Sequence, residues 1–158
     1  AYFFFWTIHH DFPPKPTPGP GVFWPSVAGG LTLAAWVLML LARRWNKSNW
    51  VVGVYSALIA GVMLASGAAA ALVAGPWTTG LDPVSHVYPA TVWVLVAWTT
   101  LHLVIGVIMQ MYCVARRAAG YLSERHDIDI WNVTLYWHFT AITVVITVAV
   151  IAGFPLAV

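Results

Sequence analysis

Apolar residues fill four long blocks of the chain, and charged residues are confined to the short segments around them. No Asp, Glu, Lys or Arg occurs between Lys47 and Asp82, between Asp82 and Arg116, or after Asp129. A helix that crosses a bilayer needs about 20 apolar residues, so each of these blocks has room for one. A further block ends at Arg43. The pattern predicts membrane-spanning helices near 25–43, 50–74, 88–114 and 131–153.

The predicted fold class is therefore all-α, a polytopic bundle of four transmembrane helices over residues 25–158. The composition agrees, with 61% hydrophobic and 8% charged residues and a mean hydropathy of +0.81. A transmembrane β-barrel would need segments of about 10 residues that alternate apolar and polar side chains. Runs such as 141–146 are too uniformly apolar for that. Residues 1–24 are expected to be the cut end of an apolar helix followed by a proline-rich linker on the outer surface.

Basic residues predict the orientation in the membrane. They gather between the first and second spans and between the third and fourth, at Arg43, Arg44, Lys47, Arg116, Arg117 and Arg125. The positive-inside rule then places these two loops in the cytoplasm and both termini outside. The small net positive charge is explained by this topology and indicates no nucleic-acid partner. Arg43, Arg44, Arg116 and Arg117 are also candidate ligands for lipid headgroups.

The other polar residues give little indication of a catalytic, metal-binding or transport site. His9 and His10 lie in the proline-rich linker, and we interpret them as solvated residues rather than metal ligands. Asp82 and His86 resemble an acid/base pair, although a surface turn explains them more simply. Every carboxylate falls in a predicted loop or tail, which disfavours an ion transporter. The single cysteine, Cys113, has no partner for an internal disulfide.

Small and polar residues predict which helix faces pack together. Gly53, Ala57, Gly61 and Ala65 recur every four residues in the second span. In lipid, helices associate through the close approach that such ridges allow, so we interpret this one as a helix seam and a candidate subunit interface. Polar residues also share one face of each later span, and we expect both faces to point inward: Thr99, His102, Gly106, Gln110 and Cys113, then Tyr136, Thr140, Thr143 and Thr147.

Two histidines lie inside apolar spans, His102 in the third and His138 in the fourth. Buried ionisable groups in a membrane are costly, so each is a candidate site. As axial ligands of one haem b they would make the chain a small electron-transfer subunit. The predicted helix ends, however, place them about 7 Å apart along the membrane normal, at a rise of about 1.5 Å per residue. Hydrogen bonding to neighbouring helices is the simpler interpretation.

The sequences around these histidines resemble a known family. Tyr136-Trp137-His138-Phe139 is similar to the last helix of subunit III of the haem–copper terminal oxidases. Leu101-His102-Leu103-Val104-Ile105-Gly106 is similar to the helix before it. The likeness covers about 88–158 well and the first two spans only loosely. The chain has four predicted spans where the family commonly has seven, so it looks like a reduced subunit III of the kind fused behind subunit I in some bacterial oxidases.

The resemblance implies a non-catalytic accessory role in a bacterial cytoplasmic membrane, in which the chain stabilises the catalytic subunit and sustains its turnover and proton uptake. It implies that subunit I and other oxidase subunits are the partners, that haem and copper belong to those partners, and that phospholipid is bound. Only His102, Gly106, Trp137 and His138 match motif positions, and together with Tyr136 we assign them to helix packing. Thr99 and Ala141 replace residues that are often His and acidic in the family. The alternatives are the haem b subunit and a membrane scaffold in an unrelated complex.

Overall fold

Four long helices form the body of the protein. The computed structural model describes residues 2–8, 12, 19–153 and 155. The long helices are α2 (Phe23–Lys47), α3 (Val51–Thr78), α4 (Val87–Ala118) and α5 (Ile128–Val148), which continues as a π-helical segment, η1 (Ala149–Gly153). All four are long and apolar enough to cross a membrane, and their ends lie within four residues of the predicted ones. No strand occurs in the described part of the chain, so the predicted all-α membrane bundle is confirmed.

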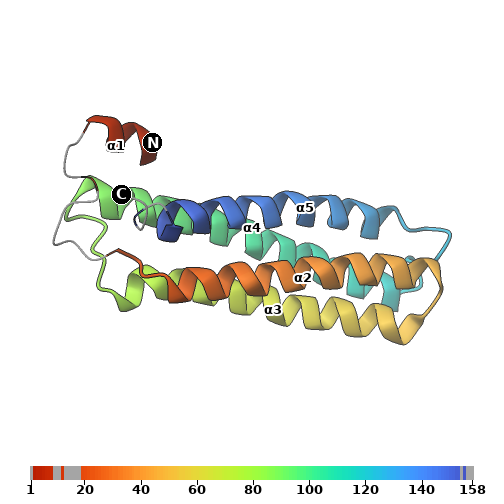
Figure 1. Ribbon diagram of the computed structural model, residues 1–158. Coiled ribbons are helices and arrows are strands. Elements are labelled where there is room, and N and C mark those ends of the chain that lie inside the picture. Colours follow the sequence, from red (N-terminus) through yellow and green to blue (C-terminus); the bar gives the residue numbers. More distant parts are fainter. Residues whose placement is uncertain (1, 9–11, 13–18, 154, 156–158) are drawn as a thin grey trace.

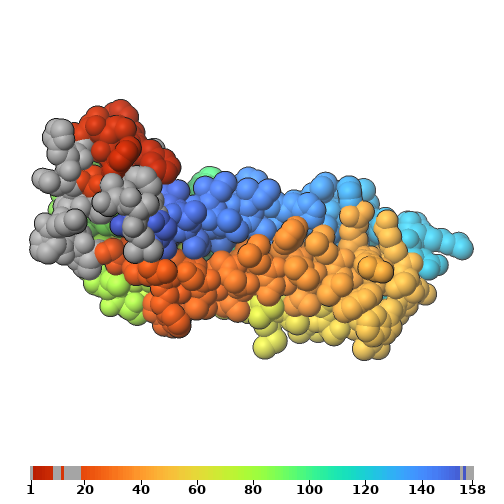
Figure 2. All heavy atoms as spheres, viewed as in Figure 1, coloured from red at the N-terminus to blue at the C-terminus, as the bar shows by residue number. Residues whose placement is uncertain are grey.

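The helices run side by side in an up-and-down bundle (Figure 1). Each packs against the next along the chain, and α5 closes the ring by packing against α2. The α2–α3 and α4–α5 connections therefore lie at the same end, which we call the basic end because the last turns of α2 and α4 there carry arginines. Seen as a solid surface, the molecule is elongated, with α2 and α5 adjacent along much of one face (Figure 2).

A heptad spacing explains this packing. Buried residues recur at alternating steps of three and four in α2, namely Pro25, Ala28, Thr32, Ala35, Met39, Ala42 and Asn46. The same spacing occurs in α4, at Val92, Val96, Thr99, Leu103, Gly106, Gln110, Cys113 and Arg117. A repeat of 3.5 residues keeps one stripe of each helix facing its neighbours and is typical of helices that cross at about 20°.

The small-residue ridge of α3 packs inside the chain. Gly53, Ala57, Gly61 and Ala65 are all buried by the protein's own helices. A Cβ placed on Gly61 would lie 2.7 Å from Nε2 of Gln110 in α4. The predicted helix seam is thus present, but the interpretation of this ridge as a subunit interface is wrong. The reason is that the close approach permitted by small residues is already used between α3 and its neighbours in the bundle.

The start of the described chain folds against the end opposite the basic end. Residues Tyr2–Ile8 form the short helix α1, as the apolar opening predicted. The rings of Tyr2, Phe12 and Tyr88 pack together, with centroids 5.1 to 6.1 Å apart. This cluster fixes α1 against the first turn of α4. His9, His10 and prolines 13, 14, 16 and 18 lie outside the described residues.

Candidate functional site

The two sequence motifs meet along the seam between α4 and α5. Gly106 leaves space for the indole of Trp137, because a Cβ at Gly106 would lie 3.1 Å from that ring. The Tyr136 hydroxyl donates a hydrogen bond of 3.1 Å to the backbone carbonyl of His102. Farther toward the α1 end, the hydroxyls of Thr99 and Thr147 lie 2.9 Å apart. The motif residues thus form one interlocked helix pair.

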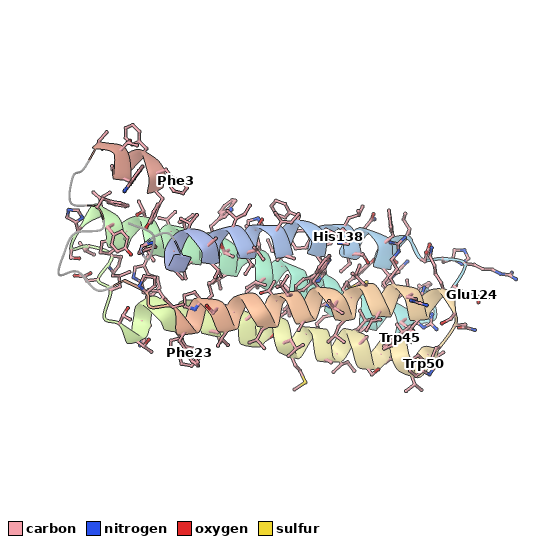
Figure 3. All side chains as sticks on the ribbon, in the orientation of Figure 1. Phe3, Phe23, Trp45, Trp50, Glu124 and His138 are labelled. Carbon is pink, nitrogen blue, oxygen red and sulfur yellow. The ribbon has the colours of Figure 1, made fainter. Side chains whose placement is uncertain are left out.

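His138 is held by a tryptophan that the sequence analysis did not single out. Nε1 of Trp36 in α2 donates to Nδ1 of His138 at 2.9 Å, and the two rings meet edge to face at 86°. An indole nitrogen can only donate, so Nδ1 of His138 must be the acceptor. The imidazole is therefore neutral, with its proton on Nε2. Figure 3 labels His138 near the middle of the bundle's length.

His102 has the opposite tautomer. Its Nδ1 lies 2.8 Å from the carbonyl oxygen of Trp98, one turn earlier in α4. A carbonyl can only accept, so Nδ1 carries the proton and Nε2 keeps a lone pair. The ring lies between the side chains of Trp98 and Phe139, at centroid distances of 4.9 and 5.3 Å. Unlike its stripe neighbours Thr99 and Gly106, His102 is only half-buried.

This placement corrects part of the predicted polar stripe. The buried series of α4 passes from Thr99 to Leu103 and then to Gly106, so it misses His102 by one residue. One residue is a rotation of about 100° around a helix. His102 therefore lies at the outer edge of the α4–α5 seam rather than in the interior. In α5, Thr140 and Thr147 are buried as predicted, whereas Tyr136 and Thr143 are half-buried.

The predicted difference in depth between the two histidines agrees with the contacts between α4 and α5. The hydroxyls of Thr99 and Thr147 are adjacent, and toward the basic end His102 lies three residues from Thr99 whereas His138 lies nine residues from Thr147. At a rise of about 1.5 Å per residue, this places the two histidines about 9 Å apart along the bundle. The ion pair between Arg116 and Asp129, in the terminal turns of α4 and α5, gives about 7 Å by the same count.

The surroundings of the two histidines also argue against a haem site. His138 contacts α2, while His102 lies across the α4 side of Phe139, so the two rings are on different flanks of α5. Haem iron needs a lone pair from each axial nitrogen, and on His138 the only lone pair is used by Trp36. The residues present do not fit a bis-histidine haem. The part of the chain that the structure describes also holds no group of three or more His, Cys, Asp or Glu side chains placed for a metal ion.

An apolar groove adjoins His138 between α2 and α5. It has a volume of about 300 Å³ and is lined by Leu33, Trp36, His138, Ala141, Ile142, Val145 and Ile146. Almost all of this lining is hydrocarbon or aromatic carbon. The groove lies toward the α1 end from the Trp36–His138 pair, at a depth where only acyl chains or other membrane helices are present. It therefore suits an apolar occupant.

Arg117 is a structural residue of the basic end and not a lipid ligand. Its guanidinium is buried and donates to Oδ1 of Asn46 at 2.7 Å and to the carbonyl of Leu122 at 3.1 Å. A second nitrogen donates to Oδ1 of Asn49, whose φ of 55° places it in the left-handed region at the α2–α3 turn. These bonds connect both loops of this end. The prediction that Arg117 binds a headgroup is wrong, because its charge is enclosed by amide and carbonyl oxygens.

The other three candidate arginines differ in how available they are. Arg116 pairs with Asp129 at 3.0 Å, which offsets part of its charge. The guanidinium of Arg43 lies 3.6 Å from the ring centre of Trp131, a cation–π contact between α2 and α5. Arg44 is exposed. Arg43 and Arg44 therefore remain the better candidates for a lipid headgroup.

The remaining polar candidates have structural roles. Oδ1 of Asp82 accepts from the backbone nitrogen of Val84 at 3.0 Å, which is a turn contact. Nδ1 of His86 accepts from the backbone nitrogen of Tyr88 and caps α4. Cys113 is buried in the bundle and is a free thiol. None of these contacts resembles an acid/base arrangement.

Comparison with known proteins adds no identification. No protein-family model matches the chain, and a search of curated proteins finds no match either.

Proposed function

We propose that this protein is a non-catalytic accessory subunit of a respiratory haem–copper terminal oxidase. The observation that supports the proposal most is the contact between the two motifs that resemble subunit III. Trp137 packs on Gly106, Tyr136 bonds to the backbone of His102, and His138 accepts from Trp36. Residues used in this way stabilise a helix bundle and leave the redox chemistry to the subunits that carry haem and copper.

The basic end and the apolar surface support the membrane part of this proposal. We place the basic end in the cytoplasm and both termini outside, in a bacterial cytoplasmic membrane, because arginine-rich loops favour that side. We further propose that Arg43 and Arg44 bind phospholipid headgroups there. The partner would be subunit I of the oxidase, to which this subunit adds stability and sustained turnover.

Purification from native membranes in a mild detergent tests the proposal. The chain would carry an affinity tag, and the co-purifying polypeptides would be identified alongside a reduced-minus-oxidised spectrum. We expect oxidase haem bands that co-purify with a subunit I-sized partner and are absent from the chain alone. A b-type band that remains with the isolated chain would instead support the electron-transfer alternative. Recovery of a partner without haem would support the unrelated scaffold.

A further inference from the structure

The outer edge of the α4–α5 seam carries a polar atom that receives no hydrogen bond from the described part of the chain. Nδ1 of His102 is bonded to Trp98, and within the described residues no donor is recorded on its Nε2. The ring is half-buried, so this nitrogen is not enclosed by the bundle. A lone pair that faces hydrocarbon lacks the hydrogen bond it would have in water, which costs free energy.

The depth of His102 excludes the usual donors. It lies 15 residues after the start of α4 at Val87 and 16 before its end at Ala118. At a rise of about 1.5 Å per residue, both ends are more than about 20 Å away. The hydrocarbon core extends only about 15 Å on each side of its midplane, so neither water nor a lipid headgroup reaches this nitrogen. A donor at this depth has to come from protein.

The surroundings of His102 also suit a protein partner. Trp98 and Phe139 flank the ring and are 59% and 51% exposed, and Leu101 beside it is 49% exposed. Large aromatic side chains around a hydrogen-bonding group are typical of the centres of protein interfaces. We call Trp98, Leu101, His102 and Phe139 the His102 face.

We propose that the His102 face is the docking surface for a transmembrane helix of a partner subunit, and that this helix donates a hydrogen bond to Nε2 of His102. The donor is a hydroxyl, amide or indole side chain located at the middle of the partner helix. The proposal adds a contact surface to the proposed function. It rests on that function only in naming the partner as subunit I. It assigns the contact to α4 and α5 rather than to the small-residue ridge of α3, which is buried within the chain.

Site-specific photocrosslinking in native membranes tests the contact. A benzophenone amino acid replaces Leu101 on the His102 face or, as a matched control, Met63 on α3, which is 70% exposed. We expect the probe at 101 to crosslink to the middle of one membrane helix of subunit I, and the probe at 63 to give no such product. Crosslinks from 101 only to lipid or to a second copy of this chain would overturn the proposal. A mid-helix crosslink to a different membrane protein would support the docking face and contradict the oxidase assignment.

Variants of His102 test the hydrogen bond itself. His102→Leu removes the acceptor, and we expect about fivefold less crosslinked partner, the loss that one membrane hydrogen bond of about 1 kcal/mol produces. Because Leu suits lipid better than His, the amount of the chain in the membrane should be unchanged or higher. His102→Gln keeps an acceptor and should restore most of the crosslink. Equal crosslinking by His102→Leu and the unsubstituted protein would show that no donor reaches His102.

Discussion

Trp36 and His138 form a hydrogen-bonded pair of rings at the middle of the bundle, with 2.9 Å between Nε1 and Nδ1. Arg43 and Trp131, each seven residues nearer the basic end, form a second contact on the same two helices. Seven residues are two helical turns, so the two contacts define one antiparallel register between α2 and α5. This register closes the ring of helices, because α2 and α5 are the first and last spans.

Trp36→Phe should lower the stability of the protein by about 1 kcal/mol, the usual net value of one hydrogen bond. The substitution keeps an aromatic ring next to α5 but leaves Nδ1 of His138 without its donor. Unfolding in a titration of denaturing detergent would measure the loss. Trp24→Phe is the matched control, because Trp24 lies on the same helix and packs against Phe23 at the α1 end. A double substitution with His138→Phe should cost less than the sum of the single changes, and strict additivity would contradict the pair.

Gly61→Leu should destabilise the protein by about 1–3 kcal/mol, the usual cost of overpacking a core. A Cβ at this position already meets Gln110 at 2.7 Å, and the longer side chain would also press on α4. Gly30→Leu is the control, because a Cβ on Gly30 meets nothing within 4 Å. Detergent unfolding of the purified chain is the measurement. If Gly61→Leu affected assembly with a partner but not this unfolding, the ridge would be an interface between subunits after all.

The hydropathy pattern was sufficient to predict the four spans, because hydrocarbon selects long runs of apolar residues whatever their neighbours. It did not predict which way each helix faces. His102 and Leu103 differ by one position, yet only Leu103 belongs to the buried heptad series. The polar stripe through His102 fitted the helical period equally well. Packing against α5 decides which of the two stripes of α4 is buried, because Trp137 of α5 packs on Gly106.

The partners of individual side chains were predicted less well for a related reason. The role of Arg117 depends on Asn46 and Asn49, which approach it only when the two loops meet. Trp36 offered one local signal, since a tryptophan far from either end of a span is not an interfacial anchor.

Arg117→Gln should cost about 2–4 kcal/mol, because it removes a charged hydrogen-bond network from a buried site. Asn46, Asn49 and the carbonyl of Leu122 would each lose a donor. Arg44→Gln removes an exposed charge from the same end and should change the stability by less than about 0.5 kcal/mol. The measurement is the free energy of unfolding of the two variants, compared in the same detergent. Similar losses for the two would mean that Arg117 acts through its charge alone.

His138→Ala should leave the haem content of the purified complex unchanged while it shortens the lifetime of the complex during turnover. The substitution removes the acceptor of Trp36 and opens the groove between α2 and α5, both of which weaken the closure of the bundle. It removes no haem ligand, because the lone pair of Nδ1 is already used by the indole and Nε2 carries the proton. Haem per complex is read from the reduced-minus-oxidised spectrum, and lifetime from the decay of oxygen consumption. His138→Gln, which keeps an acceptor near Trp36, should decay more slowly than His138→Ala. A fall in haem in proportion to the substituted chain would show that His138 is an axial ligand and that the accessory-subunit proposal is wrong.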